Sequence, residues 1–212
     1  MKRLALLLAL IALPAGAEPD GAPLAAAFGV ELQKPAGDNV HFQHGSGVFL
    51  GGGLILTAAH VVTINPQEPD VTVIMDGWKT AAKVAAIAPD GLDIALLKID
   101  PSEISAPRKA LAPVHLCSGA AAASQPVIVV SEGKVSLSAT INEKIDSPAL
   151  KGDWTDILAT GYTHGASGAG VFDASKGCLI GIIIIGTTNP GTERTLFVPA
   201  AKIAPFLAAF LH

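Results

Sequence analysis

The stretch Gly165-Ala166-Ser167-Gly168-Ala169-Gly170 surrounds one serine with glycine and alanine only. Small neighbours leave a serine hydroxyl open to an approaching ligand, and glycine lets the backbone turn tightly beside it. Two N–H groups of such a turn can point to the same side and hold an oxyanion. A glycine-rich turn between two strands explains the same residues. The choice between the two depends on whether the rest of the chain offers a base and an acid.

A histidine in the first half of the chain is a candidate for the base. His60 follows Leu54–Thr57, a stretch with strand character, and Ala58 and Ala59 leave little bulk beside it. Histidine changes charge near neutral pH, which suits a general base. A core histidine with satisfied hydrogen bonds is the alternative.

An aspartate at the head of an apolar stretch is a candidate for the acid. Asp93 stands directly before Ile94-Ala95-Leu96-Leu97. A buried carboxylate is costly without hydrogen bonds. A histidine N–H would satisfy it, and the bond would fix the tautomer whose other nitrogen accepts a proton. An ordinary turn aspartate is the alternative, and Asp90 fits that description equally well.

The order of these three residues along the chain separates the known hydrolase classes. An α/β-hydrolase runs Ser, Asp, His with the motif G-x-S-x-G, which Ala169 breaks here, and a subtilisin-like enzyme runs Asp, His, Ser. The order His60, Asp93, Ser167 is the chymotrypsin one.

Three motifs at these positions resemble those of chymotrypsin-like (trypsin-like, PA clan) serine proteases. They are T-A-A-H-V-V at 57–62, D-I-A-L-L-K-I at 93–99 and G-A-S-G-A-G-V-F at 165–172. The compact spacing and the closing segment Phe197–Ala200 resemble two bacterial branches, the glutamyl-endopeptidase-like enzymes and Deg-type protease domains. We expect no PDZ domain after this one. The resemblance covers roughly Val40 to the C-terminus.

The resemblance implies an all-β fold of two antiparallel six-stranded β-barrels with a short C-terminal helix and an active site between the barrels. Short stretches with strand character from about Val40, broken by Gly, Pro, Asn and Asp, favour an all-β fold as well. The implied reaction is hydrolysis of a peptide bond in a protein or peptide substrate through an acyl-enzyme, with no cofactor. Ser167 would be the nucleophile, His60 the base and Asp93 its orienting acid. The N–H groups of Gly165 and Ser167 would form the oxyanion hole.

Two positions depart from the pattern of the family. Ala166 stands where the family usually has Asp or Asn, so we expect no zymogen switch and a less rigidly held oxyanion loop. Ile184 stands near a position where digestive relatives carry a serine that supports the triad aspartate. A catalytically weak or inactive protease-like module that binds peptides or proteins is therefore the alternative function.

The resemblance also predicts which residues contact the substrate. They are Thr163, His164, Ile183, Ile184, Ile185 and Gly186. No acid stands at the positions expected for cleavage after Arg or Lys, and no histidine stands on the strand 182–185, where a glutamate preference would require one. We expect a preference for small or medium apolar side chains.

The start of the chain has the pattern of a secretory signal peptide. Met1-Lys2-Arg3 precedes the apolar run Leu4–Leu13, and Ala15-Gly16-Ala17 forms an A-x-A ending. We expect cleavage after residue 17 and export to the periplasm or the medium, with no stable membrane anchor afterwards. Cys117 and Cys178 are then candidates for one disulfide, with two buried thiols as the alternative. A formal charge of −4 with scattered basic residues does not suggest nucleic acid.

These patterns divide the chain into five segments. A signal peptide (1–17) precedes an N-terminal β-barrel lobe (18–112), a connector (113–125), a C-terminal β-barrel lobe (126–199) and a terminal helix (200–212). No metal site is predicted, because His41 and His44 have no third ligand cluster beside them.

Overall fold

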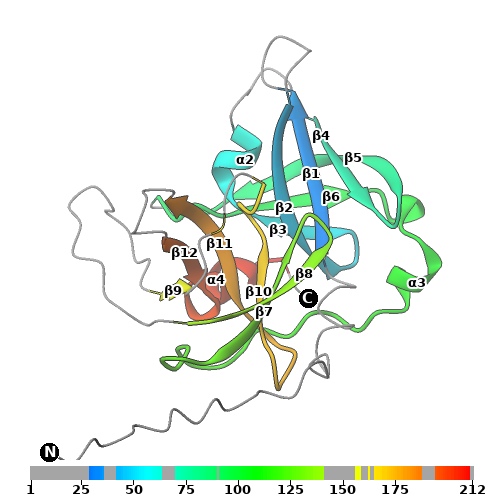
Figure 1. The fold of residues 1–212 in the computed structure, drawn as a ribbon. Coiled ribbons are helices and arrows are strands. Elements are labelled where there is room, and N and C mark those ends of the chain that lie inside the picture. Colours follow the sequence, from blue (N-terminus) through cyan, green and yellow to red (C-terminus); the bar gives the residue numbers. More distant parts are fainter. Residues whose placement is uncertain are drawn as a thin grey trace, which may run out of the picture.

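The strands of the protein fall into two groups. The computed structural model describes residues 29–35, 42–63, 70–89, 91–140, 156–158, 162, 165–187 and 194–210. Figure 1 shows β1–β6, from the first half of the chain, beside β7–β12, from the second half. Strand β2 contacts both β7 and β10 where the halves meet. The predicted all-β fold of two strand-built halves is confirmed. The predicted signal peptide lies outside the described residues.

The first half forms a closed barrel. Its strands follow the order β1-β2-β3-β6-β5-β4, and antiparallel pairing of β1 with β4 closes the ring. A closed ring leaves no unpaired strand edge. The strands are β1 (Gly29–Pro35), β2 (Phe42–Gly51), β3 (Leu54–Thr57), β4 (Asp70–Met75), β5 (Trp78–Ile87) and β6 (Ala95–Ile99), and the short helix α2 (Ala59–Thr63) lies between β3 and β4.

Strands β2 and β3 form a hairpin around three glycines. Strands β2 and β3 pair antiparallel, with Val48 opposite Leu56. Gly51, Gly52 and Gly53 all have positive φ angles, and a Cβ on Gly53 would lie 2.8 Å from the Ile99 carbonyl oxygen. The close approach of this turn to β6 therefore requires glycine at position 53.

Strand β1 was not predicted from the sequence, where strands were expected from about Val40. Within it Val30 and Leu32 are buried, whereas Glu31 and Gln33 are partly exposed. Four alternating residues are too few to separate a strand from a loop by pattern alone. Pairing with β2 and β4 stabilises the strand, so tertiary structure decides its conformation.

Residues 100–112, between β6 and the predicted connector, contain two short helical turns and one buried arginine. The turns are η1 (Pro101–Glu103) and α3 (Ala106–Lys109). Arg108 is 6% exposed, and its guanidinium carbon lies 5.8 Å from the centre of the Phe49 ring. Its Nη2 donates to the Gly29 carbonyl oxygen at 3.0 Å, which attaches this segment to the start of β1.

An aspartate in the β4–β5 turn balances the charge of Arg108. Arg108 Nε donates to Asp76 Oδ2 at 2.9 Å, and the Ser105 hydroxyl donates to the same oxygen at 2.8 Å. Burial acts to raise the pKa of Asp76, but these two hydrogen bonds and the Arg108 charge lower it below its ordinary value of 3.8. The ionised carboxylate is thus the form that the fold favours.

The second half forms a six-stranded antiparallel sheet in the order β8-β7-β10-β11-β12-β9. No pairing of its end strands, β8 with β9, is found over the described residues, which leave out 141–155. The strands are β7 (Pro126–Ser131), β8 (Lys134–Ala139), β9 (Asp156–Leu158), β10 (Gly170–Asp173), β11 (Leu179–Thr187) and β12 (Arg194–Pro199).

The predicted C-terminal helix is present and is shorter than expected. Helix α4 spans Ala200–Leu207, whereas residues 200–212 were predicted to be helical. Its buried residues, Ala200, Ile203 and Leu207, face β11 and β12. Among the described residues, none of the helices has the length and hydrophobicity of a membrane-spanning segment.

Two hydrophobic clusters make up the core. The larger one contains residues of both halves, including Val48, Val130 and Phe172. The smaller one belongs to the second half and includes Ala166 and Ile183. Because the larger cluster spans both halves, the two halves pack as one body around it.

Candidate active site

The predicted base and acid are joined by two hydrogen bonds. Asp93 Oδ2 lies 2.6 Å from His60 Nδ1, and Asp93 Oδ1 accepts the backbone N–H of His60 at 2.8 Å. The Asp93 carbonyl oxygen also accepts the N–H of Ala59 at 3.2 Å. One residue therefore holds both the imidazole ring and the first turn of α2.

The residues beside this pair are buried, but the imidazole ring itself remains accessible to solvent. Ala58, Val61 and Val62 beside the histidine are buried. The His60 side chain is 40% exposed, and that of Asp93 is 18% exposed. When Nδ1 donates to the carboxylate, Nε2 is the nitrogen that can accept a proton.

The loop that carries Ser167 packs directly against the first barrel. Gly165 and Gly168 have φ angles of +90° and +87°, which favour glycine. A Cβ on Gly168 would collide with the Ser46 carbonyl oxygen and with Thr57 Oγ1. These two residues lie on β2 and at the end of β3, so the loop contacts the strand that leads into His60.

Hydrogen bonds fix the peptide groups on both sides of Ser167. The Ala166 carbonyl accepts the N–H of Ala169 at 2.8 Å, and the Ser167 carbonyl accepts the N–H of Ser46 at 2.8 Å. The N–H of Gly168 donates to the Ile183 carbonyl at 2.6 Å. Because the N–H and C=O of a trans peptide point in opposite directions, the N–H of Ser167 points away from Ala169.

The structure brings the Ser167 loop to α2 without a hydrogen bond between the two predicted reacting groups. A Cβ on Gly45 would lie 2.5 Å from Val61 Cγ1 and 3.3 Å from the Ser167 carbonyl oxygen. The residue after His60 and the backbone of Ser167 therefore flank the same glycine of β2. Within the described residues no hydrogen bond joins Ser167 Oγ to His60.

Three polar residues around the site were missed in the sequence. Ser46 and Thr57 hydrogen-bond each other, through Thr57 Oγ1 and the Ser46 carbonyl, at 2.7 Å. A Cβ on Gly165 would collide with the carboxylate of Glu132, which lies in the β7–β8 turn. The only sequence signal for Ser46 is its position between Gly45 and Gly47 in a strand, and no signal marks Glu132.

The predicted substrate-contacting residues are placed only in part. Thr163 and His164 lie outside the described residues. Ile183 and Ile184 are each 1% exposed and pack into the smaller and larger cluster, respectively. The backbone of Ile185 and Gly186 pairs with β12. The role of these six residues in binding substrate stays a prediction.

Two hydroxyl groups hold Tyr162, which precedes the undescribed pair 163–164. The N–H of Tyr162 donates to Thr195 Oγ1 at 2.7 Å, and its phenol oxygen lies 2.8 Å from Ser136 Oγ. Thr195 is fully buried. This hydroxyl therefore supports the backbone before the Ser167 loop.

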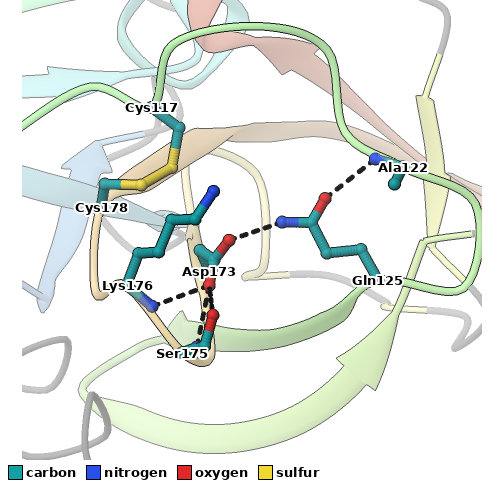
Figure 2. Close-up of a disulfide and its surroundings, with 7 residues drawn as sticks. All are labelled: Cys117, Ala122, Gln125, Asp173, Ser175, Lys176 and Cys178. Atoms are coloured by element: carbon teal, nitrogen blue, oxygen red, sulfur yellow. Dashed lines mark hydrogen bonds between the residues drawn. A yellow bond between two sulfur atoms is a disulfide. The ribbon is translucent and has the colours of Figure 1, made fainter.

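A disulfide joins the connector to the second sheet. Cys117 and Cys178 are bridged, with 5.2 Å between their Cα atoms, as Figure 2 shows. Asp173 beside the bridge accepts hydrogen bonds from Ser175, from the N–H of Lys176 and from Gln125.

Burial acts to raise the pKa of Asp173, but these hydrogen bonds lower it below its ordinary value. The two sulfur atoms and the carboxylate come within 4.8 Å of one another, the spacing of a metal cluster. Because the sulfurs are bonded together and the carboxylate is occupied by donors, the group is a structural cluster rather than a metal site.

Comparison with known proteins gives one family and a group of solved structures. The model of the trypsin-like peptidase domain family matches residues 45–182, more than half of the chain. None of the curated proteins compared with the chain matches it in sequence.

Among solved structures, the active form of the Rv3671c protease from M. tuberculosis is similar to this chain. It has a TM-score of 0.68 and 19% identity, over 90% of this chain and 83% of that one. The serine endoprotease from Yersinia pestis has a TM-score of 0.65 and 21% identity, over 92% and 66%. The HtrA-type protease AlgW with a decapeptide has a TM-score of 0.63 and 20% identity, over 92% and 68%. The fold and the family match agree with the motifs around His60, Asp93 and Ser167, and the chain belongs to the trypsin-like peptidase domain family of serine endopeptidases.

Proposed function

We propose that this serine endopeptidase is exported and cleaves peptide bonds through His60, Asp93 and Ser167. The observation that carries the proposal is the double hydrogen bond of Asp93 to the ring and the backbone of His60. A carboxylate in this position orients the imidazole and stabilises its cation once it has accepted a proton.

The reaction then runs in two halves. Ser167 Oγ attacks the carbonyl carbon of the substrate while His60 Nε2 accepts the hydroxyl proton, and a tetrahedral oxyanion forms. His60 gives that proton to the leaving amine, the peptide bond breaks and an acyl-enzyme remains. A water molecule, deprotonated by His60, releases the acyl group and restores Ser167.

The oxyanion is assigned to the N–H groups of Gly165 and Ser167. The bond between the Ala166 carbonyl and the Ala169 N–H supports this assignment, because it orients the Ser167 N–H. Loss of one such donor typically costs about 3–4 kcal/mol of transition-state stabilisation. The substrate side chain is assigned to the surface around residues 163–164 and 183–186, with a preference for small or medium apolar groups.

Export is proposed from two observations. The first 17 residues have the charge, apolar run and small-residue ending of a signal peptide. The Cys117–Cys178 disulfide suits an oxidising compartment, such as the periplasm or the medium. Mass spectrometry of protein recovered from the periplasm and the medium tests this, with a mature N-terminus at Glu18 as the expected result.

Covalent labelling with a fluorescent fluorophosphonate tests the catalytic assignment. We expect the wild type to be labelled between neutral and mildly alkaline pH, and Ser167→Ala to remain unlabelled. Ser118→Ala removes an exposed serine hydroxyl and serves as the matched control, with labelling like the wild type. Folded wild type that is not labelled, but binds peptides with the affinity of Ser167→Ala, would indicate the peptide-binding module instead.

A further inference from the structure

Four hydrogen bonds of Ser46 hold the Ser167 loop or its support, and a fifth joins its hydroxyl to that of Ser131 at 3.3 Å. Its hydroxyl donates to the Gly165 carbonyl at 2.7 Å and accepts the N–H of Glu132 at 2.9 Å. Its backbone N–H donates to the Ser167 carbonyl at 2.8 Å, and its carbonyl accepts Thr57 Oγ1 at 2.7 Å. The residue is fully buried.

The two neighbours of Ser46 show how closely β2 is packed at this point. A Cβ on Gly45 would lie 2.5 Å from Val61 Cγ1, and a Cβ on Gly47 would lie 2.8 Å from Ile55 Cγ2. Side chains are therefore excluded on both sides of Ser46. Its hydroxyl is the one side-chain group that this tripeptide directs at the second half of the molecule.

Two carbonyl groups of the Ser167 loop accept hydrogen bonds from Ser46, a residue of the other half. The Gly165 and Ser167 carbonyls both bind Ser46, while the Ala166 carbonyl between them binds Ala169. Three successive peptide groups are thus oriented, including the one that carries the Ser167 N–H. A flanking residue with an acidic or amide side chain could help to hold such a loop, but Ala166 has no polar side-chain atom.

We propose that Ser46 is a positioning residue that sets the oxyanion-binding geometry of the Gly165–Ser167 loop, an inference that rests on the proposed function. Removal of the hydroxyl leaves the buried Gly165 carbonyl and the partly buried Glu132 N–H without their shared hydrogen-bond partner. Such groups turn toward other partners, because an unpaired buried polar group is costly. The peptide group between Gly165 and Ala166 then loses its fixed orientation. The backbone N–H of Ser167, in the next peptide group, is then no longer held in one direction.

Fluorophosphonate kinetics test this role, because the phosphonyl oxygen of the adduct occupies the oxyanion site. We compare the maximal labelling rate, kinact, and the half-saturating concentration, KI, in wild type, Ser46→Ala and Ser131→Ala. Ser131 Oγ lies 3.3 Å from Ser46 Oγ, so its removal deletes a hydroxyl from the same cluster without freeing the Gly165 carbonyl. Circular dichroism and thermal melting establish the folded fraction of each variant.

For folded Ser46→Ala we expect kinact to fall by about 10- to 100-fold, since a misaimed donor costs less than a deleted one, and KI to stay within about 3-fold. Ser131→Ala should keep both constants. A purely structural role predicts a lower melting temperature with kinact unchanged per folded molecule, and that result overturns the proposal.

A second variant covers the case in which Ser46→Ala does not fold. Ser46→Cys keeps a side chain of similar shape but offers a weak donor, so its kinact should fall several-fold; a wild-type kinact overturns the proposal. Wild type that is not labelled at all refutes the proposed function and the role of Ser46 together. Wild type labelled at Ser167, with equal rates in every Ser46 variant, refutes only the role of Ser46.

Discussion

The two halves of the molecule hold their predicted catalytic residues in different ways. In the first half, Asp93 binds the ring and the backbone of His60, and both residues belong to connections within one closed barrel. In the second half, the Ser167 loop is held by Ser46, which belongs to the other half. The predicted base and acid are therefore held together within one barrel, whereas the loop of the predicted nucleophile depends on how the two halves meet.

The same difference appears in how each half is stabilised. The first barrel closes by strand pairing, and the ion pair between the buried Arg108 and the exposed Asp76 attaches the segment 100–112 to it. The second half is tied to the connector by the Cys117–Cys178 disulfide. Four variants test these contrasts, beginning with the largest expected effect.

Asp93→Asn tests whether Asp93 alone orients the His60 ring within the first barrel. The amide can accept the His60 backbone N–H, but it favours the wrong tautomer of the ring, and we expect labelling and peptide hydrolysis to fall by about 10⁴-fold. Quenched time courses with excess fluorophosphonate or peptide measure the two rates. Asp100→Asn, which alters an exposed acid at the end of β6, should keep full activity. A loss below about 10-fold would mean that Asp93 does not orient the base.

The double variant Cys117→Ser/Cys178→Ser tests the support of the second half. The bridge spans 61 residues of sequence, and its removal should lower the free energy of unfolding by about 3–4 kcal/mol. Urea unfolding measures the loss. Hydrogen exchange should rise more in β10 and β11 than in the first barrel. An equal rise in both halves would contradict the contrast drawn above.

Asp76→Asn tests the ion pair between the buried Arg108 and the exposed Asp76 in the first half. The change leaves the Arg108 charge buried without its counterion, and we expect a loss of about 2 kcal/mol, less than for a fully buried pair because Asp76 is partly exposed. The folded-state pKa of Asp76 lies below 3.8, so its carboxylate stabilises the fold above about pH 4 and loses that effect as the pH falls through the folded pKa.

Urea unfolding at a series of pH values measures both consequences of Asp76→Asn. The wild type should lose stability below about pH 4 more steeply than the variant. Parallel pH profiles for the two proteins would mean that Asp76 does not contribute to acid sensitivity.

Glu132→Gln tests the contact between the β7–β8 turn and the oxyanion loop. The Glu132 carboxylate lies against Gly165, so its negative charge opposes a developing oxyanion there. We expect the neutral side chain to raise kinact by about 2- to 5-fold, because solvent screens a partly exposed charge. Glu103→Gln removes an exposed carboxylate of η1 and controls for net charge. A fall in kinact would show that the carboxylate supports the loop instead.

Much of the fold could be predicted because its signals are local. The glycine hairpin after β2, the apolar strand β6 and the helix at Ala200 are marked by turn residues and by apolar spacing within a few residues. Strand β1 carried too short a pattern to be recognised. Its conformation depends on pairing with β2 and β4, which are distant in sequence.

The sequence by itself determined which residues are candidates and in what order they occur. Small neighbours mark Ser167, strand ends mark His60 and Asp93, and their order excludes two other hydrolase classes. Ala166 suggested a loosely held loop, because a local pattern shows only the side chains that flank the serine.

Only the tertiary structure decided how that loop is held. Ser46 lies 119 residues from Gly165 in the sequence, and its hydroxyl reaches the Gly165 carbonyl because β2 packs against the second half with glycine on both sides of Ser46. Hydrogen bonds of this kind depend on the distance between atoms in the folded chain, and no spacing along the sequence encodes that distance.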